Sequence, residues 1–187
     1  MVALSVAIAI AIAMPAGILI TRRPKWRTLA LGFASVMQTV PSLALFGFLI
    51  PVPFIGGIGR HTAVIALIFY ALLPILRNTV TGILGVDPAV RESALAMGLT
   101  GWQMLWMVEL PLAARTILGG IRIATVTTVG TATIAAAIGA GGLGVLVFRG
   151  IAMVDAQEIL AGAIPSAVLA LLADGGLGWL ERKLAPV

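Results

Sequence analysis

Apolar residues gather in five long stretches, which polar or glycine-rich segments separate. They cover about residues 2–20, 29–50, 62–76, 117–138 and 159–173. A helix crosses the hydrocarbon core of a bilayer with about 20 residues, so three stretches suffice alone and the two shorter ones need flanking residues. The pattern predicts an all-α fold: one polytopic membrane bundle of about five transmembrane helices over residues 1–187.

Composition supports a membrane protein and excludes several kinds of site. The chain is 60% hydrophobic and only 10% charged, which is too little charge to cover the surface of a soluble domain of this length. It has no cysteine and a single histidine, His61. A disulfide framework, a thiolate nucleophile and a Cys- or His-based metal site are therefore excluded, and we expect no metal and no cofactor in this chain.

The basic residues predict how the chain crosses the membrane. Lys25 and three arginines directly follow the first apolar stretch, the reverse of a signal peptide, so this stretch is read as a retained span. If the N-terminus lies outside, ten of the twelve basic residues fall in or beside cytoplasmic segments, as the positive-inside rule requires. We therefore expect a cytoplasmic C-terminus. Because a span rarely starts right at an outside terminus, we also expect a missing upstream helix or a trimmed start. The ten residues are Arg22, Arg23, Lys25, Arg27, Arg77, Arg91, Arg115, Arg122, Arg182 and Lys183.

The net charge of +5 could also indicate nucleic-acid binding. Its placement beside apolar stretches fits membrane topology better, so we expect lipid and no nucleic acid as a partner.

The segment of about residues 77–116, between the third and fourth stretches, is amphipathic. Asp87-Pro88 is a strong helix start, because the carboxylate caps free N–H groups and proline suits the first turn. This helix should end at Gly98. Thr100 and Gln103 then form a capping box that starts a second short helix, which Leu110-Pro111 should end. Glu92 would project from the first helix, where a partner arginine could pair with it and fix the register.

A spaced motif in this loop resembles a known family. Glu92-Ser93-Ala94 is followed after three residues by Gly98, and after nine more by Val108, one residue and Leu110-Pro111. This spacing is similar to the EAA loop of bacterial ABC importer permeases, with Ser93 and Val108 as mild departures from alanine and isoleucine. The resemblance implies an ATPase-coupling site in this loop, made by Asp87, Arg91, Glu92, Ser93, Ala94, Gly98, Leu110 and Pro111.

The similarity extends along most of the chain. Segments 38–44, 73–79, 139–144 and 162–165 look like the glycine betaine/carnitine/choline permeases. The family implies import of a quaternary-ammonium osmolyte across a bacterial cytoplasmic membrane. It also implies a second permease subunit, two ATPase subunits, and a binding protein or fused binding domain outside. The chain has no P-loop, and its only lysines are Lys25 and Lys183, so ATP and Mg²⁺ would bind the ATPase subunit.

Small polar residues suggest a path for the solute. Thr125, Thr128 and Thr131 recur every three residues in the fourth stretch, and a polar segment around Pro41 interrupts the second. Either these groups line a path between two subunits, or they satisfy their own helices and assist packing. Arg122 and Asp174 lie near span ends, where we expect their charges to reach the interface. The candidate path residues are Gln38, Thr39, Pro41, Ser42, Thr125, Thr128 and Thr131.

Three alternatives remain open. A permease of the same class could carry another solute, such as methionine or another amino acid. A secondary transporter is disfavoured, because no carboxylate lies in mid-span and no internal repeat is evident. A membrane enzyme would need a paired acid–base or metal constellation, which the sequence does not offer.

Overall fold

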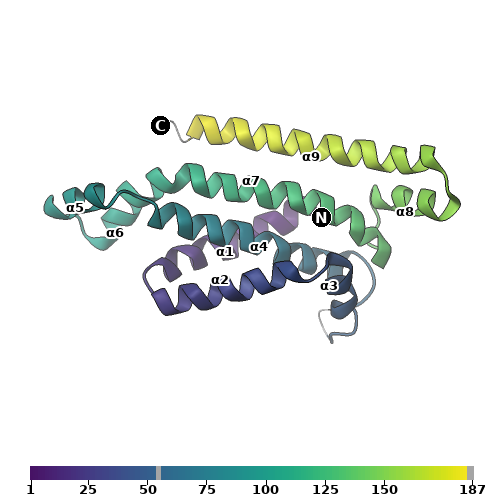
Figure 1. Cartoon of the computed structure of the whole chain (residues 1–187), viewed down its shortest axis with the longest axis horizontal. Coiled ribbons are helices and arrows are strands. Elements are labelled where there is room, and N and C mark those ends of the chain that lie inside the picture. The colour runs from purple at the N-terminus through teal and green to yellow at the C-terminus, as the bar shows by residue number, and fades with distance from the viewer. Residues whose placement is uncertain (54–55, 185–187) are drawn as a thin grey trace.

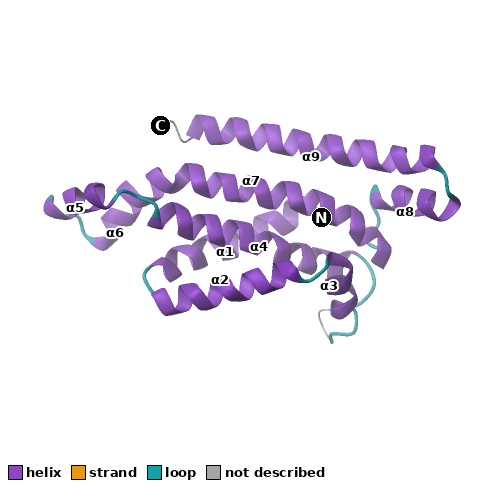
Figure 2. Ribbon diagram, in the orientation of Figure 1, coloured by secondary structure: helices purple, strands orange, loops and turns teal. Residues whose placement is uncertain are grey.

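In the computed structural model, residues 1–53 and 56–184 are described, and this part of the chain is helical without a strand (Figure 2). Short turns join the helices, so neighbours in sequence are mostly neighbours in space. The elements are α1 (Val2–Thr21), α2 (Pro24–Thr39), α3 (Ser42–Leu49), α4 (Arg60–Leu84), α5 (Pro88–Ala96), α6 (Gly101–Met104), the π-helical η1 (Leu105–Glu109), α7 (Leu110–Ile134), the 3-10 helix η2 (Ala135–Ile138), α8 (Gly144–Met153) and α9 (Ala156–Leu184).

The long helices form an elongated bundle with α4 at its centre. Helix α4 packs against α1 and α7, and α9 lies along the outer side of α7 (Figure 1). More than half of the apolar window of α4 is buried, against 6% of that of α9. Small residues allow the close packing, as in other membrane bundles. The core between α1, α4 and α7 includes Ala9, Ala13, Ala71 and Ala124.

The structure confirms the predicted class of about five spans. Four helices are long and apolar enough to cross a membrane, and α2 with α3 makes a fifth if this pair, bent by 100°, is one span. The bend lies at Pro41, which has no N–H and cannot continue the helix of α2. Tyr70 of α4 donates a hydrogen bond from its hydroxyl to the Val40 carbonyl, 2.5 Å away. The bend is thus fixed from a neighbouring helix.

Two boundaries differ from the sequence prediction. Helix α4 continues to Leu84, so the loop begins at Gly85 rather than near Arg77, which lies on the helix. Leu110-Pro111 does not end the second loop helix: α6, η1 and α7 form one continuous helical segment from Gly101 to Ile138. Proline is tolerated because it occupies the first turn of α7, directly after the π-helical turn, where a regular hydrogen bond is already missing.

The bundle has two distinct ends. We call the end with α5, α6, the α1–α2 turn and the C-terminal part of α9 the basic end, and the end with α3 and α8 the glycine end (Figure 1). At the glycine end, Gly139, Gly141 and Gly142 have φ values of 77°, 78° and 85°. Side chains rarely adopt this left-handed conformation, so the tight turn between η2 and α8 requires glycine. The basic cluster of residues 22–27 lies at the other end.

Candidate coupling site and transport surface

Helix α5 is set between a strong cap and a glycine turn, as the sequence predicts. The Asp87 carboxylate accepts a hydrogen bond of 2.8 Å from the Ala89 N–H, and Pro88 opens the helix. Gly98 has a φ of 82° and reverses the chain after α5. These two residues delimit a short helix at the basic end, between α4 and α6 in the chain.

Helix α6 starts at the predicted capping box. The Gln103 N–H donates to the Thr100 hydroxyl, and the Thr100 N–H donates to the Gln103 side-chain oxygen at 2.8 Å. Trp102 and Trp106 contact each other edge to face, with ring centroids 5.5 Å apart. Both rings are largely exposed.

The outer surface of this loop combines one free charge with apolar side chains. Glu92 is exposed and forms no ion pair with any described residue. Ala94 is buried, and the Ser93 hydroxyl donates to the Ala89 carbonyl on its own helix, so neither presents a free polar group. We call the large exposed apolar residues of the segment 90–107 the loop patch. The loop patch comprises Val90, Leu95, Met97, Trp102, Trp106 and Met107.

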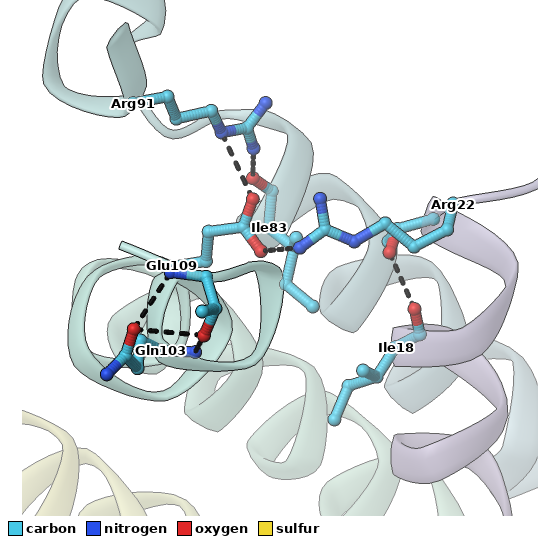
Figure 3. A network of polar contacts seen from close by, with 8 residues as sticks. Ile18, Arg22, Ile83, Arg91, Gln103 and Glu109 are labelled. Atoms are coloured by element: carbon cyan, nitrogen blue, oxygen red, sulfur yellow. Dashed lines mark hydrogen bonds and ion pairs between the residues drawn. The ribbon is translucent and has the colours of Figure 1, made fainter. Parts of the chain in front are cut away.

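Behind this surface lies a charged cluster that the sequence reasoning missed. The Glu109 side chain is 1% exposed, and its Oε2 accepts a hydrogen bond of 2.6 Å from Arg22 at the end of α1 (Figure 3). Arg91 of α5 places its Nε 3.3 Å from Glu109 Oε1, and its other nitrogen donates to the Ile83 carbonyl near the end of α4. The sequence does show Glu109 as a carboxylate within an apolar run, directly before Leu110-Pro111. It does not show the two partner arginines, which lie 87 and 18 residues away.

The three threonines of α7 do not form one open face. Thr128 is fully buried and its hydroxyl donates 2.6 Å to the Ala124 carbonyl, so it lies in the packed interior rather than on a surface toward another subunit. The hydroxyls of Thr125 and Thr131, which are half-buried, also donate to carbonyls one turn back. Thr128 therefore contributes to no exposed wall of this subunit, and its role in a solute path stays a prediction. Its spacing from Thr125 was right, but spacing alone does not tell which side of a helix faces the core.

The polar segment at the α2–α3 bend lies elsewhere. Gln38, Thr39 and Pro41 are exposed and Ser42 is half-buried. Helix α2 packs on α4 and α1, on the side of the bundle away from α9 (Figure 1). Within one subunit, the structure does not bring this segment together with the α7 threonines.

A polar groove opens instead between α7 and α9. It has a volume of about 450 Å³, and its lining includes Arg122, Thr127 and Asp174. Arg122 donates two hydrogen bonds to Asp174, one of them 2.6 Å long, and lies 3.7 Å from Glu181. The two charges therefore pair across the helices instead of reaching the interface separately. A groove lined by charges is not stable against lipid, so this face requires water or protein against it.

Long apolar spans, a capped loop at one end and a polar groove along one side fit one class of protein, the membrane-spanning subunit of a transport system. The chain belongs to the family described as the binding-protein-dependent transport system inner membrane component, which matches residues 9–186. It is a multi-pass inner-membrane subunit of an ABC transporter that works with ATPase subunits.

This chain is similar to several known permeases over nearly its whole length. The carnitine transport permease protein OpuCB of Listeria monocytogenes is 48% identical over 182 residues, covering 97% of this chain and 82% of the relative. The osmoprotectant import permease protein OsmW of Salmonella typhimurium is 46% identical, covering 100% and 87%. Among solved structures, a chain of the inward-facing MetNI methionine ABC transporter superposes with a TM-score of 0.84 at 25% identity, covering 97% of this chain and 89% of that chain.

Proposed function

We propose that this permease subunit imports a small quaternary-ammonium osmolyte of the glycine betaine, carnitine or choline type into the cytoplasm. The observation that carries the proposal is the end-to-end similarity to permeases named for these solutes, such as the glycine betaine/carnitine/choline permease protein OpuCB of Bacillus subtilis, 43% identical over 183 residues. A methionine permease gives a close superposition at only 25% identity, which supports the shared fold more than a shared solute.

We assign the loop patch and Glu92 to docking of the ATPase subunit. Exposed tryptophan and methionine are enriched at protein interfaces, and an unpaired carboxylate such as Glu92 can pair with an arginine of a partner. The basic end then faces the cytoplasm, because the cluster of Arg22, Arg23, Lys25 and Arg27 lies there. This orientation places the N-terminus of α1 outside and the end of α9 inside.

The solute path is proposed to run between two copies of this chain or between this chain and a related one. The α7–α9 groove supports this assignment, since its charged lining needs water or protein against it. Thr125 and Thr131 and the exposed α2–α3 bend stay as candidate lining residues, on different sides of the subunit. A binding protein outside would deliver the solute at the glycine end.

The test of the function is transport by the reconstituted complex. This chain, its ATPase subunit and its binding protein are placed in liposomes, and uptake of labelled glycine betaine, carnitine, choline and methionine is measured with and without ATP. We expect ATP-dependent uptake of at least one quaternary-ammonium solute and none of methionine. Uptake of methionine alone would show that the solute is assigned wrongly.

The docking assignment has its own test. Glu92→Ala should weaken binding of the ATPase subunit at least tenfold, because truncating one partner of a desolvated charge pair costs about 2–5 kcal/mol. Ser93→Ala is the matched control: it changes the next residue on the same helix to the alanine usual in this motif and should bind normally. Wild-type affinity of Glu92→Ala would place the docking surface elsewhere.

A further inference from the structure

We propose that Glu109 is a positioning residue for energy coupling: with Arg22 and Arg91, it joins the docking helix α5 to α1, α4 and α7, so that a movement of α5 reaches these spans together. The inference rests on the proposed docking of the ATPase subunit at this loop. It concerns residues behind the docking surface, not on it, because the Glu109 side chain is 1% exposed.

The first argument is where the three side chains come from. Arg22 follows the last residue of α1, Arg91 lies in α5, and Glu109 ends η1 directly before α7. Arg91 also donates to the carbonyl of Ile83 in α4. One carboxylate therefore links, within a single set of contacts, the docking helix and the basic ends of three spans (Figure 3).

The second argument is the cost of this arrangement. A buried carboxylate loses its hydration, and an ion pair recovers that loss only with good geometry, so an apolar residue would pack here at lower cost. Leu105 and Ala113, four residues before and after Glu109, belong to a buried apolar cluster. We therefore infer that the buried charge of Glu109 serves to hold the helices in one relative position, beyond any gain in stability.

The third argument is that the two contacts differ. Arg22 makes a hydrogen bond of 2.6 Å to Glu109, whereas Arg91 Nε is buried without a hydrogen-bond partner, although it lies 3.3 Å from Oε1. The bond to α1 is complete and the contact with α5 is electrostatic only. The α5 side is thus the side on which a small shift can form a hydrogen bond to Glu109.

The π-helical turn supports the same role. In η1 the Leu110 N–H donates to the Leu105 carbonyl, five residues back, which adds a residue to the turn and rotates the residues before it relative to α7. Such single π turns inside α-helices are frequent at functional sites. Here the turn separates the register of α6, on the docking side, from that of the span, and Glu109 lies at the junction.

The experiment compares four variants in the complete reconstituted complex: Glu109→Gln, Arg22→Gln, Arg22→Lys and, as the matched control, Arg23→Gln. Arg23 is the adjacent, exposed arginine of the same turn and forms no ion pair with a described residue. Three quantities are measured per assembled complex: affinity for the ATPase subunit, stimulation of ATP hydrolysis by loaded binding protein, and solute transported per ATP hydrolysed.

We expect Glu109→Gln and Arg22→Gln to bind the ATPase subunit within about twofold of wild type, since the loop patch and Glu92 are intact. Stimulation and solute per ATP should fall at least fivefold. Arg22→Lys, which keeps the charge, should recover most of the coupling, and Arg23→Gln should behave as wild type. If Glu109→Gln does not assemble, the test rests on the two Arg22 variants. The Arg22 side chain is 54% exposed, so its replacement leaves no cavity.

Wild-type coupling in both Glu109→Gln and Arg22→Gln would overturn the inference. It would also be overturned if Arg23→Gln lost as much coupling as these two variants. Loss of ATPase binding in both would assign the cluster to docking instead. These outcomes are separate from the proposed function. A wild-type complex that transports another solute refutes the osmolyte assignment but leaves the effect of Glu109 measurable, while a wild-type complex that binds no ATPase subunit refutes both.

Discussion

Replacement of Gly120 by alanine tests the packing of α4 against α7. A Cβ at this position would lie 2.5 Å from the Asn78 Cβ and 2.9 Å from the Pro74 carbonyl oxygen. Carbon atoms normally approach to about 3.5–4.0 Å, so the helices would have to separate by roughly 1 Å. Overpacking of this kind costs about 1–3 kcal/mol.

The adjacent Gly119 provides the control, because a Cβ there meets no atom of the chain within 4 Å. Both variants gain the same helix preference of alanine over glycine, about 0.5–1 kcal/mol. The difference between them therefore isolates the overpacking, and we expect Gly119→Ala to be more stable than Gly120→Ala by about 1–3 kcal/mol.

The assay is reversible unfolding of the detergent-solubilised subunit by a denaturing detergent, followed by circular dichroism. If the unfolding free energies of the two variants agree within about 0.5 kcal/mol, which is a usual size for a neutral substitution, the close approach of α4 and α7 at Gly120 is not a stabilising contact and the reasoning fails.

Three further predictions follow from the same structure. Thr128→Trp should reduce the yield of folded subunit, because its site is fully enclosed, whereas Thr131→Trp should fold and reduce uptake; size-exclusion profiles and transport assays distinguish the two. Asp87→Ala removes the cap of α5, should cost about 1 kcal/mol locally, and should show as faster hydrogen exchange in α5 than in α4. Asp174→Asn removes the charge of the ion pair with Arg122 and one of its two acceptor oxygens, and faster exchange in α9 with unchanged exchange in α4 is the expected result.

Much of the fold could be predicted because local signals suffice for it. Apolar stretches locate the spans, Asp87-Pro88 starts α5, and Thr100 with Gln103 starts α6. The two helix starts depend on residues within four positions of one another, and each span depends on one continuous apolar stretch. The length of α4 could not be predicted in this way, since its last turns are amphipathic and pack on α7 only in the folded bundle.

The parts of the site that were missed depend on distant partners or on which side of a helix faces inward. The role of Glu109 could not be predicted because its partner Arg22 lies 87 residues away in sequence. Thr128 looked equivalent to Thr125, since a mostly apolar helix in a membrane protein has no polar face to mark its outer side. The roles assigned to the loop and to the path stay predictions until the variants above are measured.

The continuous helix from Gly101 to Ile138 has a mechanical consequence. Its 38 residues make a rod of about 57 Å, at 1.5 Å per residue. If such a rod pivots near its middle, its two tips move in opposite directions. A tilt of about 10° would move each tip by roughly 5 Å. One tip follows the docking loop and the other leads into the glycine turn at 139–144. In the proposed orientation, a push on the docking loop would therefore swing the opposite tip, at the glycine end, in the opposite sense.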